Sequence, residues 1–132
     1  NDTLRDAGVS TAHYFMFGGP GETEETVLQG VENIRELECA AAFIFLGIRI
    51  LPGTELHDIA LEEGVVEADR DMLNPVYYFS PHVDRSWLEK TLQDAFASMR
   101  RVIYPPGSMD DTLRLLHKLG HGGVLWDLLA ER

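Results

Sequence analysis

The sequence lacks the features that mark several classes of protein. It contains one cysteine in 132 residues, which excludes an internal disulfide and a metal site built from several thiolates. No run of about 18 apolar residues occurs, so we expect no membrane-spanning helix. No basic leader precedes an apolar segment, so no secretory signal is visible. The single cysteine favours a reducing, cytoplasmic location.

Basic residues are also scarce. The chain has 11 Lys and Arg against 22 Asp and Glu, and its net charge is −11. Residues 1–71 hold 15 acids and four bases, whereas residues 72–132 hold seven of each. A chain this acidic should repel nucleic acid and anionic membrane surfaces. The change in charge predicts two sub-regions that meet near residue 71.

Strand and helix signals alternate through residues 1–71. They predict a short helix over 1–8, a strand over 9–17, a helix over 23–37, a strand over 41–51 and a helix over 52–64. This order is typical of a βαβα unit with parallel strands, and therefore of the α/β class. Strands that are apolar on both faces are typical of parallel sheets covered by helices.

Two parallel strands cannot bury all their faces and edges. The only further strand candidate is Val76–Phe79. We therefore expect the sheet to continue elsewhere, either as the end of a larger barrel or by pairing between the edges of two copies.

Residues 72–132 are predicted to form a helical tail. Asp84 is the expected N-cap of a helix over 85–101. Residues 104–107 include two prolines and a glycine, and they are expected to separate this helix from the next one. Ser108 and Asp111 have the spacing of a capping box for the next helix. A short amphipathic piece over 124–130 follows.

The two expected strands end in similar turns. Residues 17–23 read FGGPGET and residues 50–55 read ILPGTE, so each places a Pro-Gly turn between a strand and a capped helix. Ligands bind at this end of parallel α/β sheets, and glycine lets the backbone approach a flat ligand. Pro-Gly pairs are also ordinary turn formers. The first turn does not match the phosphate-binding GxxxxGK[ST] pattern, although a barrel enzyme of another kind could hold phosphate at Gly18–Thr23.

These segments resemble one enzyme family. Residues 11–26 (TAHYFMFGGPGETEET) and 47–56 (GIRILPGTEL) are similar to the C-terminal half of the catalytic domain of radical S-adenosylmethionine (SAM) enzymes. The similarity is to the subgroup that often carries a cobalamin-binding domain. It covers residues 1 to 67, and residues 75–81 (PVYYFSP) resemble the segment that follows the barrel in this subgroup.

The resemblance implies a partial (β/α) barrel of six strands, of which residues 1–71 supply the fifth and sixth. Residues 72–132 would then be a helical C-terminal extension that closes the barrel mouth. The implied cofactors are SAM, a 4Fe–4S cluster and, on another domain, cobalamin. The CxxxCxxC motif that holds the cluster in this family is absent, because Cys39 is the only cysteine. We therefore expect a fragment that is inactive alone, with the motif upstream of Asn1 and the rest of the barrel as its partner.

The resemblance also implies a SAM site. The family packs adenine on the end of the fifth strand, which maps onto Met16, Phe17 and Gly18. Strand alternation favours Met16 over Phe17 as the contacting side chain. Backbone groups after the sixth strand hold the adenine edge, and they map onto residues 47–49 (Gly47, Ile48 and Arg49).

Four further residues are candidates for the pocket, and three of them also have a structural interpretation. Arg49 could bind a carboxylate of SAM or an anionic substrate, or form a structural ion pair. Tyr14 could line the pocket or fill the core, with core filling favoured. Glu22 could accept from the amino group of SAM or cap the following helix, with capping favoured. Gly19 belongs to the same turn.

The histidines and the cysteine favour structural roles. His13 faces away from Met16 and is expected to contact a helix. His117 and His121 lie four residues apart, as two ligands on one helix face would, but no third ligand is apparent. Cys39 is expected to be a small buried apolar group.

A second hypothesis is a non-catalytic α/β module that works by self-association or partner binding. In either hypothesis, open apolar strand edges predict a homo-oligomer of the isolated chain.

Overall fold

A three-stranded parallel sheet lies at the centre of the computed structural model, which describes residues 1–38, 40–123 and 125–129. Its strands are β1 (Thr11–Phe17), β2 (Ala40–Leu46) and β5 (Val102–Ile103), in the order β1-β2-β5. β1 and β2 pair in parallel from Thr11 opposite Ala40 to Phe17 opposite Leu46. The described residues form no closed barrel, and the α/β class with parallel strands is confirmed.

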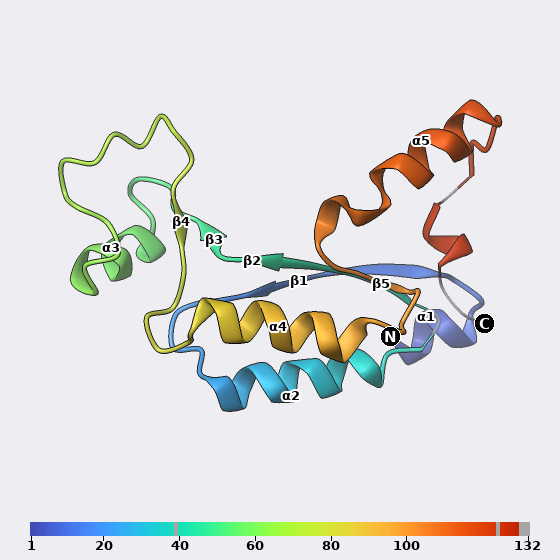
Figure 1. The fold of residues 1–132 in the computed structure, drawn as a ribbon, viewed down its shortest axis with the longest axis horizontal. Coiled ribbons are helices and arrows are strands. Elements are labelled where there is room, and N and C mark those ends of the chain that lie inside the picture. Colours follow the sequence, from blue (N-terminus) through green and yellow to red (C-terminus); the bar gives the residue numbers. More distant parts are fainter. Residues whose placement is uncertain (39, 124, 130–132) are drawn as a thin grey trace.

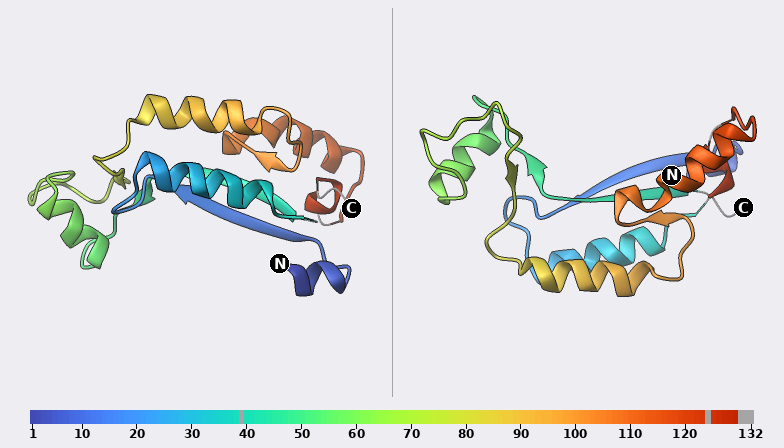
Figure 2. Two further views of the ribbon diagram at one scale, coloured as in Figure 1. Left: turned by 90° about the horizontal axis from the view of Figure 1, so that it is seen from below. Right: turned by 45° about the horizontal axis from the view of Figure 1, so that its top comes forward.

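Helices cover one face of this sheet. α2 (Glu24–Arg35) and α4 (Arg85–Phe96) lie side by side on it, as Figures 1 and 2 show. A shared core fills the space between them and the strands, and burial of each large side chain there contributes roughly 1.5–3 kcal/mol. The fully buried members of this core are Val27, Ile34, Ala42, Ile44, Leu88 and Leu92.

The remaining elements lie around the sheet (Figure 1). α1 (Asp2–Asp6) lies near the amino end of β1, and α3 (Glu55–Glu62) lies beyond the carboxyl end of β2. The short strands β3 (Ile48–Arg49) and β4 (Tyr77–Tyr78) form a separate antiparallel pair. The 3₁₀ turns η1 (Pro106–Met109) and η2 (Leu125–Leu128) and the helix α5 (Asp110–Lys118) lie on the uncovered face of the sheet.

The predicted tail contains strands as well as helices. The helix predicted over 85–101 ends at Phe96, and β5 supplies the third parallel strand that the sequence did not predict. The candidate strand at Val76–Phe79 forms β4, but it pairs antiparallel to β3 outside the main sheet. A boundary near residue 71 stays a prediction. Residues on both sides of it share the core between the sheet, α2 and α4.

Two local predictions were wrong. The strand over 41–51 is interrupted at Gly47, whose φ of 75° breaks the extended backbone between β2 and β3. The predicted box of Ser108 and Asp111 does not form, because η1 leads directly into α5 and Met109 is the N-cap without a side-chain hydrogen bond.

Candidate functional site

The turns after β1 and β2 meet at the carboxyl end of the sheet. The Gly47 N–H donates to the Phe17 carbonyl at 2.7 Å, which joins the end of β2 to the end of β1. Gly18 and Gly47 both have positive φ, at 91° and 75°. The residues that the resemblance implies for SAM binding therefore lie together, as parallel pairing of the two strands requires.

The Glu22 side chain forms a hydrogen bond within the first turn. Its carboxylate accepts a hydrogen bond from the Gly18 N–H, so the predicted helix-capping role for Glu22 is wrong. Thr23 caps α2 instead, in a reciprocal capping box with Thr26. With Glu22 in this turn and Glu24 at the start of α2, negative charge surrounds the helix N-terminus. This arrangement opposes the binding of a phosphate.

Two residues of the tail, Phe79 and Ser80, complete this end of the sheet. The Ser80 N–H donates to the Gly18 carbonyl at 2.9 Å, and the Ser80 hydroxyl donates to the Glu22 carbonyl at 3.0 Å. A Cβ on Gly18 would lie 2.7 Å from the Phe79 ring, so that ring occupies the space that the missing side chain leaves. Sequence reasoning missed both residues, and no local pattern indicates which turn they would contact.

Gly47 makes room for the backbone of β4. A Cβ at this position would lie 2.8 Å from the Tyr78 carbonyl oxygen. Ile48 then pairs with Tyr78, and Arg49 pairs with Tyr77. Arg49 is exposed and forms no ion pair with any residue that the structure describes. The structural ion pair weighed for Arg49 is therefore not made within this part of the chain.

Met16 and Phe17 lie on opposite faces of β1. Phe17 is buried in the core beside α2, where a Cβ on Gly30 would lie 2.9 Å from its ring. Met16 is 57% exposed on the other face. Tyr14, on the same face as Met16, is 63% exposed, so it does not fill a core in this structure. Of the two strand-end side chains, only Met16 can contact a ligand without opening the core.

A buried tyrosine links the tail to α3. The Tyr78 hydroxyl donates to the Glu63 carboxylate just after α3. Burial raises the pKa of Tyr78 to about 12, and the hydrogen bond and negative charge of Glu63 add to the rise.

This pKa predicts a loss of stability at alkaline pH. In the unfolded chain the pKa of Tyr78 returns to about 10, so neutral Tyr78 stabilises the fold below that pH. We expect the free energy of unfolding to fall between pH 10 and pH 12 more steeply in the wild type than in Tyr78→Phe. Urea titrations across this range test it, with exposed Tyr77→Phe as the matched control. Equal slopes for the wild type and Tyr78→Phe would contradict the prediction.

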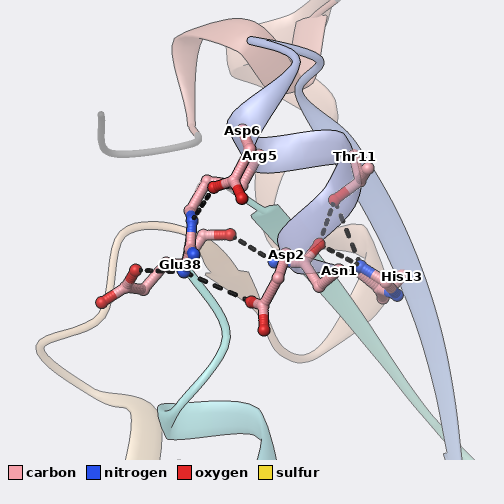
Figure 3. Close-up of polar contacts among 7 residues, drawn as sticks. All are labelled: Asn1, Asp2, Arg5, Asp6, Thr11, His13 and Glu38. Carbon is pink, nitrogen blue, oxygen red and sulfur yellow. Dashed lines mark hydrogen bonds and ion pairs between the residues drawn. The ribbon is translucent and has the colours of Figure 1, made fainter.

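Polar residues join α1 to the neighbouring loop and strand (Figure 3). Asn1 Oδ1 accepts from the Thr11 hydroxyl at 3.0 Å and lies 3.2 Å from His13 Nε2. Arg5 forms an ion pair with Glu38 at 2.8 Å. His13 therefore lies beside α1 and away from the Met16 face. The exposed ion pair between Arg5 and Glu38 contributes little to stability.

The structure describes no group of three metal-ligating side chains. His117 and His121 lie at the end of α5 and beyond it, and no third ligand joins them among the described residues. Cys39 lies outside the described residues. One cysteine does not fit a 4Fe–4S cluster, which needs three thiolates from the CxxxCxxC motif, so this chain cannot hold that cofactor by itself.

Comparison of the chain with models of known protein families, with curated proteins and with solved structures finds no match. Within the described part of the chain, no helix combines the length and apolar character that a bilayer crossing requires.

Proposed function

We propose that this chain forms one wall of the SAM pocket of a radical SAM enzyme, as the fifth and sixth strands of a partial barrel. The observation that carries the proposal is the exposed Met16 beside the joined turns at Gly18 and Gly47. An exposed apolar side chain at the carboxyl ends of parallel strands suits a flat ring such as adenine.

The residues of this chain would bind and orient SAM. Met16 and the half-buried Phe45 opposite it in β2 provide the apolar surface for the adenine ring. The exposed guanidinium of Arg49 offers paired N–H donors to the SAM carboxylate or to an anionic substrate. A 4Fe–4S cluster, held by cysteines outside this chain, would supply the reductive cleavage of SAM. The contribution of this chain is therefore to position SAM and to exclude water, not to cleave SAM.

Formation of 5′-deoxyadenosine tests this function. The protein used is the polypeptide that contains this chain and an upstream CxxxCxxC segment, reconstituted with iron and sulfide without oxygen. After addition of dithionite and SAM, we expect 5′-deoxyadenosine by chromatography, and its loss when the three cysteines become alanine. The proposal would be contradicted if the polypeptide that contains this chain has no CxxxCxxC segment, or if it binds no iron.

A second candidate is self-association through β1. Among the described residues, β1 has a strand partner on one side only, and none of its residues carries a full charge that would block pairing. Natural edge strands usually carry such protection. A second copy could therefore add its own β1 to this edge.

The isolated chain is expected to be a dimer. Light scattering at micromolar concentration should give about twice the 14.8 kDa mass of one chain. Tyr14→Lys should shift the mass to a monomer, because the lysine places a charge in the middle of the paired strands, whereas Tyr77→Lys should not. A wild-type mass of one chain would contradict self-association and leave the SAM proposal in place.

A further inference from the structure

Residues 48–78 form a unit with a core of its own. This segment contains β3, α3 and β4, and it stands beyond the carboxyl end of the main sheet (Figures 1 and 2). Its apolar side chains pack around Ile50, Ala60, Val66 and Tyr78. None of these side chains belongs to the core between the sheet, α2 and α4, and no described residue of that core lies within 48–78.

Polar contacts do not tie this unit to the rest of the chain. Every hydrogen bond that a described residue of 48–78 forms has its partner within 48–78, including the pairing of β3 with β4 and the bond between Tyr78 and Glu63. The ion pairs among the described residues all lie outside the unit. Units joined in this way move relative to one another unless a large apolar interface holds them.

The chain enters and leaves the unit at a narrow neck, next to Gly47 and Phe79. At this neck the Ile48 side chain lies 3.5 Å from the place that a Cβ on Gly19 would take, and the Tyr78 carbonyl fills the space beside Gly47. Atoms at a pivot move least when the unit bends, so these contacts allow a small rotation. A few residues where two elements join are the usual hinges of such motions.

A pocket beside the neck gives the unit room to bend. Its volume is about 190 Å³, and Gly47, Tyr77 and Phe79 line it together with Arg85 at the start of α4. α4 lies on the covered face of the sheet, whereas Met16 is exposed on the other face. Bending into the pocket therefore carries the unit away from Met16, and the return movement brings it back towards the candidate site.

We propose that residues 48–78 are a lid, which bends at this neck and closes the carboxyl end of the sheet over a bound ligand. Ligands bind at this end of parallel sheets, and hinged closure of this kind excludes water from them. The ligand proposed for this end is SAM, so the closing step rests on the proposed function. The hinge itself does not depend on it.

Distances between spin labels test the hinge. The labels are attached to p-acetylphenylalanine, because its ketone reacts without involving cysteine. One pair of labels replaces exposed Glu62 of the lid and exposed Arg100 after α4, and the control pair replaces exposed Glu25 of α2 and the same Arg100. Electron–electron resonance on the isolated chain, diluted with excess unlabelled chain, should give a broader distance distribution for the lid pair than for the control pair. Circular dichroism checks that each labelled chain folds.

The same labels test closing in the polypeptide that carries the upstream cysteines. We expect saturating SAM to narrow the distribution between positions 62 and 100 and to leave that between positions 25 and 100 unchanged. Equal widths for the two pairs in the isolated chain would overturn the lid, and so would SAM that binds without changing the distribution of the lid pair. A failure of SAM to bind would instead contradict the proposed function, and with it the closing step.

Discussion

Replacing Gly47 by alanine is expected to lower the free energy of unfolding by about 3 kcal/mol. At the φ of 75° a side chain costs roughly 1–2 kcal/mol in backbone strain. The added Cβ would also lie 2.8 Å from the Tyr78 carbonyl oxygen, and this atom belongs to paired backbone that cannot easily move. Overpacking of this kind adds about 1–3 kcal/mol.

Gly53 supplies the control for this substitution. Its φ is also 75°, but a Cβ there would meet no atom within 4 Å. Gly53→Ala should therefore cost only the backbone strain, about 1–2 kcal/mol. Urea unfolding followed by circular dichroism measures both variants. Equal losses would show that β4 does not pack against Gly47 as the structure has it.

The second large effect is expected at Arg101. This side chain is 7% exposed and lies next to the C-terminal end of α2. Its Nη2 donates to the Ile34 carbonyl at 3.1 Å and to the Arg35 carbonyl at 2.9 Å. It therefore adds a charged donor to the Arg35 carbonyl and to the Ile34 carbonyl, which also accepts from the Leu37 N–H at 3.3 Å, and its positive charge favours that end of the helix dipole.

Arg101→Ala should lower the free energy of unfolding by about 3 kcal/mol, because hydrogen bonds from a charged donor contribute about 1.5–3 kcal/mol each. The neighbouring Arg100 is exposed, so Arg100→Ala should change it by less than about 0.5 kcal/mol. Arg101→Lys should recover only part of the loss, because ammonium cannot reproduce the planar fork. A loss no larger than that of Arg100→Ala would contradict this role.

The elements that could be predicted are those with local patterns. β1 and α2 carry a β-branched and aromatic run, a Thr23 cap and apolar residues at helical spacing, and both lie close to their predicted ranges. β2 begins where it was predicted but ends at Leu46, five residues early. β5 could not be predicted, because its two residues form a strand only through pairing with Ala42 and Phe43. Propensity carries little information over so short a segment.

The glycines of the site show a similar limit. The position of Gly18 at the carboxyl end of its strand followed from the Pro-Gly turn, whereas Gly47 fell inside the predicted strand over 41–51 and was assigned to the strand end by the resemblance alone. The sequence does not show what occupies the space that they leave, and that space is taken by Phe79 at Gly18 and by the Tyr78 backbone at Gly47. These contacts join residues about 30 to 60 positions apart in the chain, so only the fold reveals them.

Equilibrium binding of SAM tests the central claim most directly. The protein is the polypeptide with the upstream cysteines, and the variants are Met16→Asp and Leu28→Asp. Both replaced side chains are exposed, at 57% and 50%, but Leu28 lies on α2. We expect Met16→Asp to weaken SAM binding by about tenfold or more, because a carboxylate replaces the apolar contact with adenine. Leu28→Asp should bind as the wild type does, and equal affinity for the two variants would contradict the assignment of β1 to the SAM pocket.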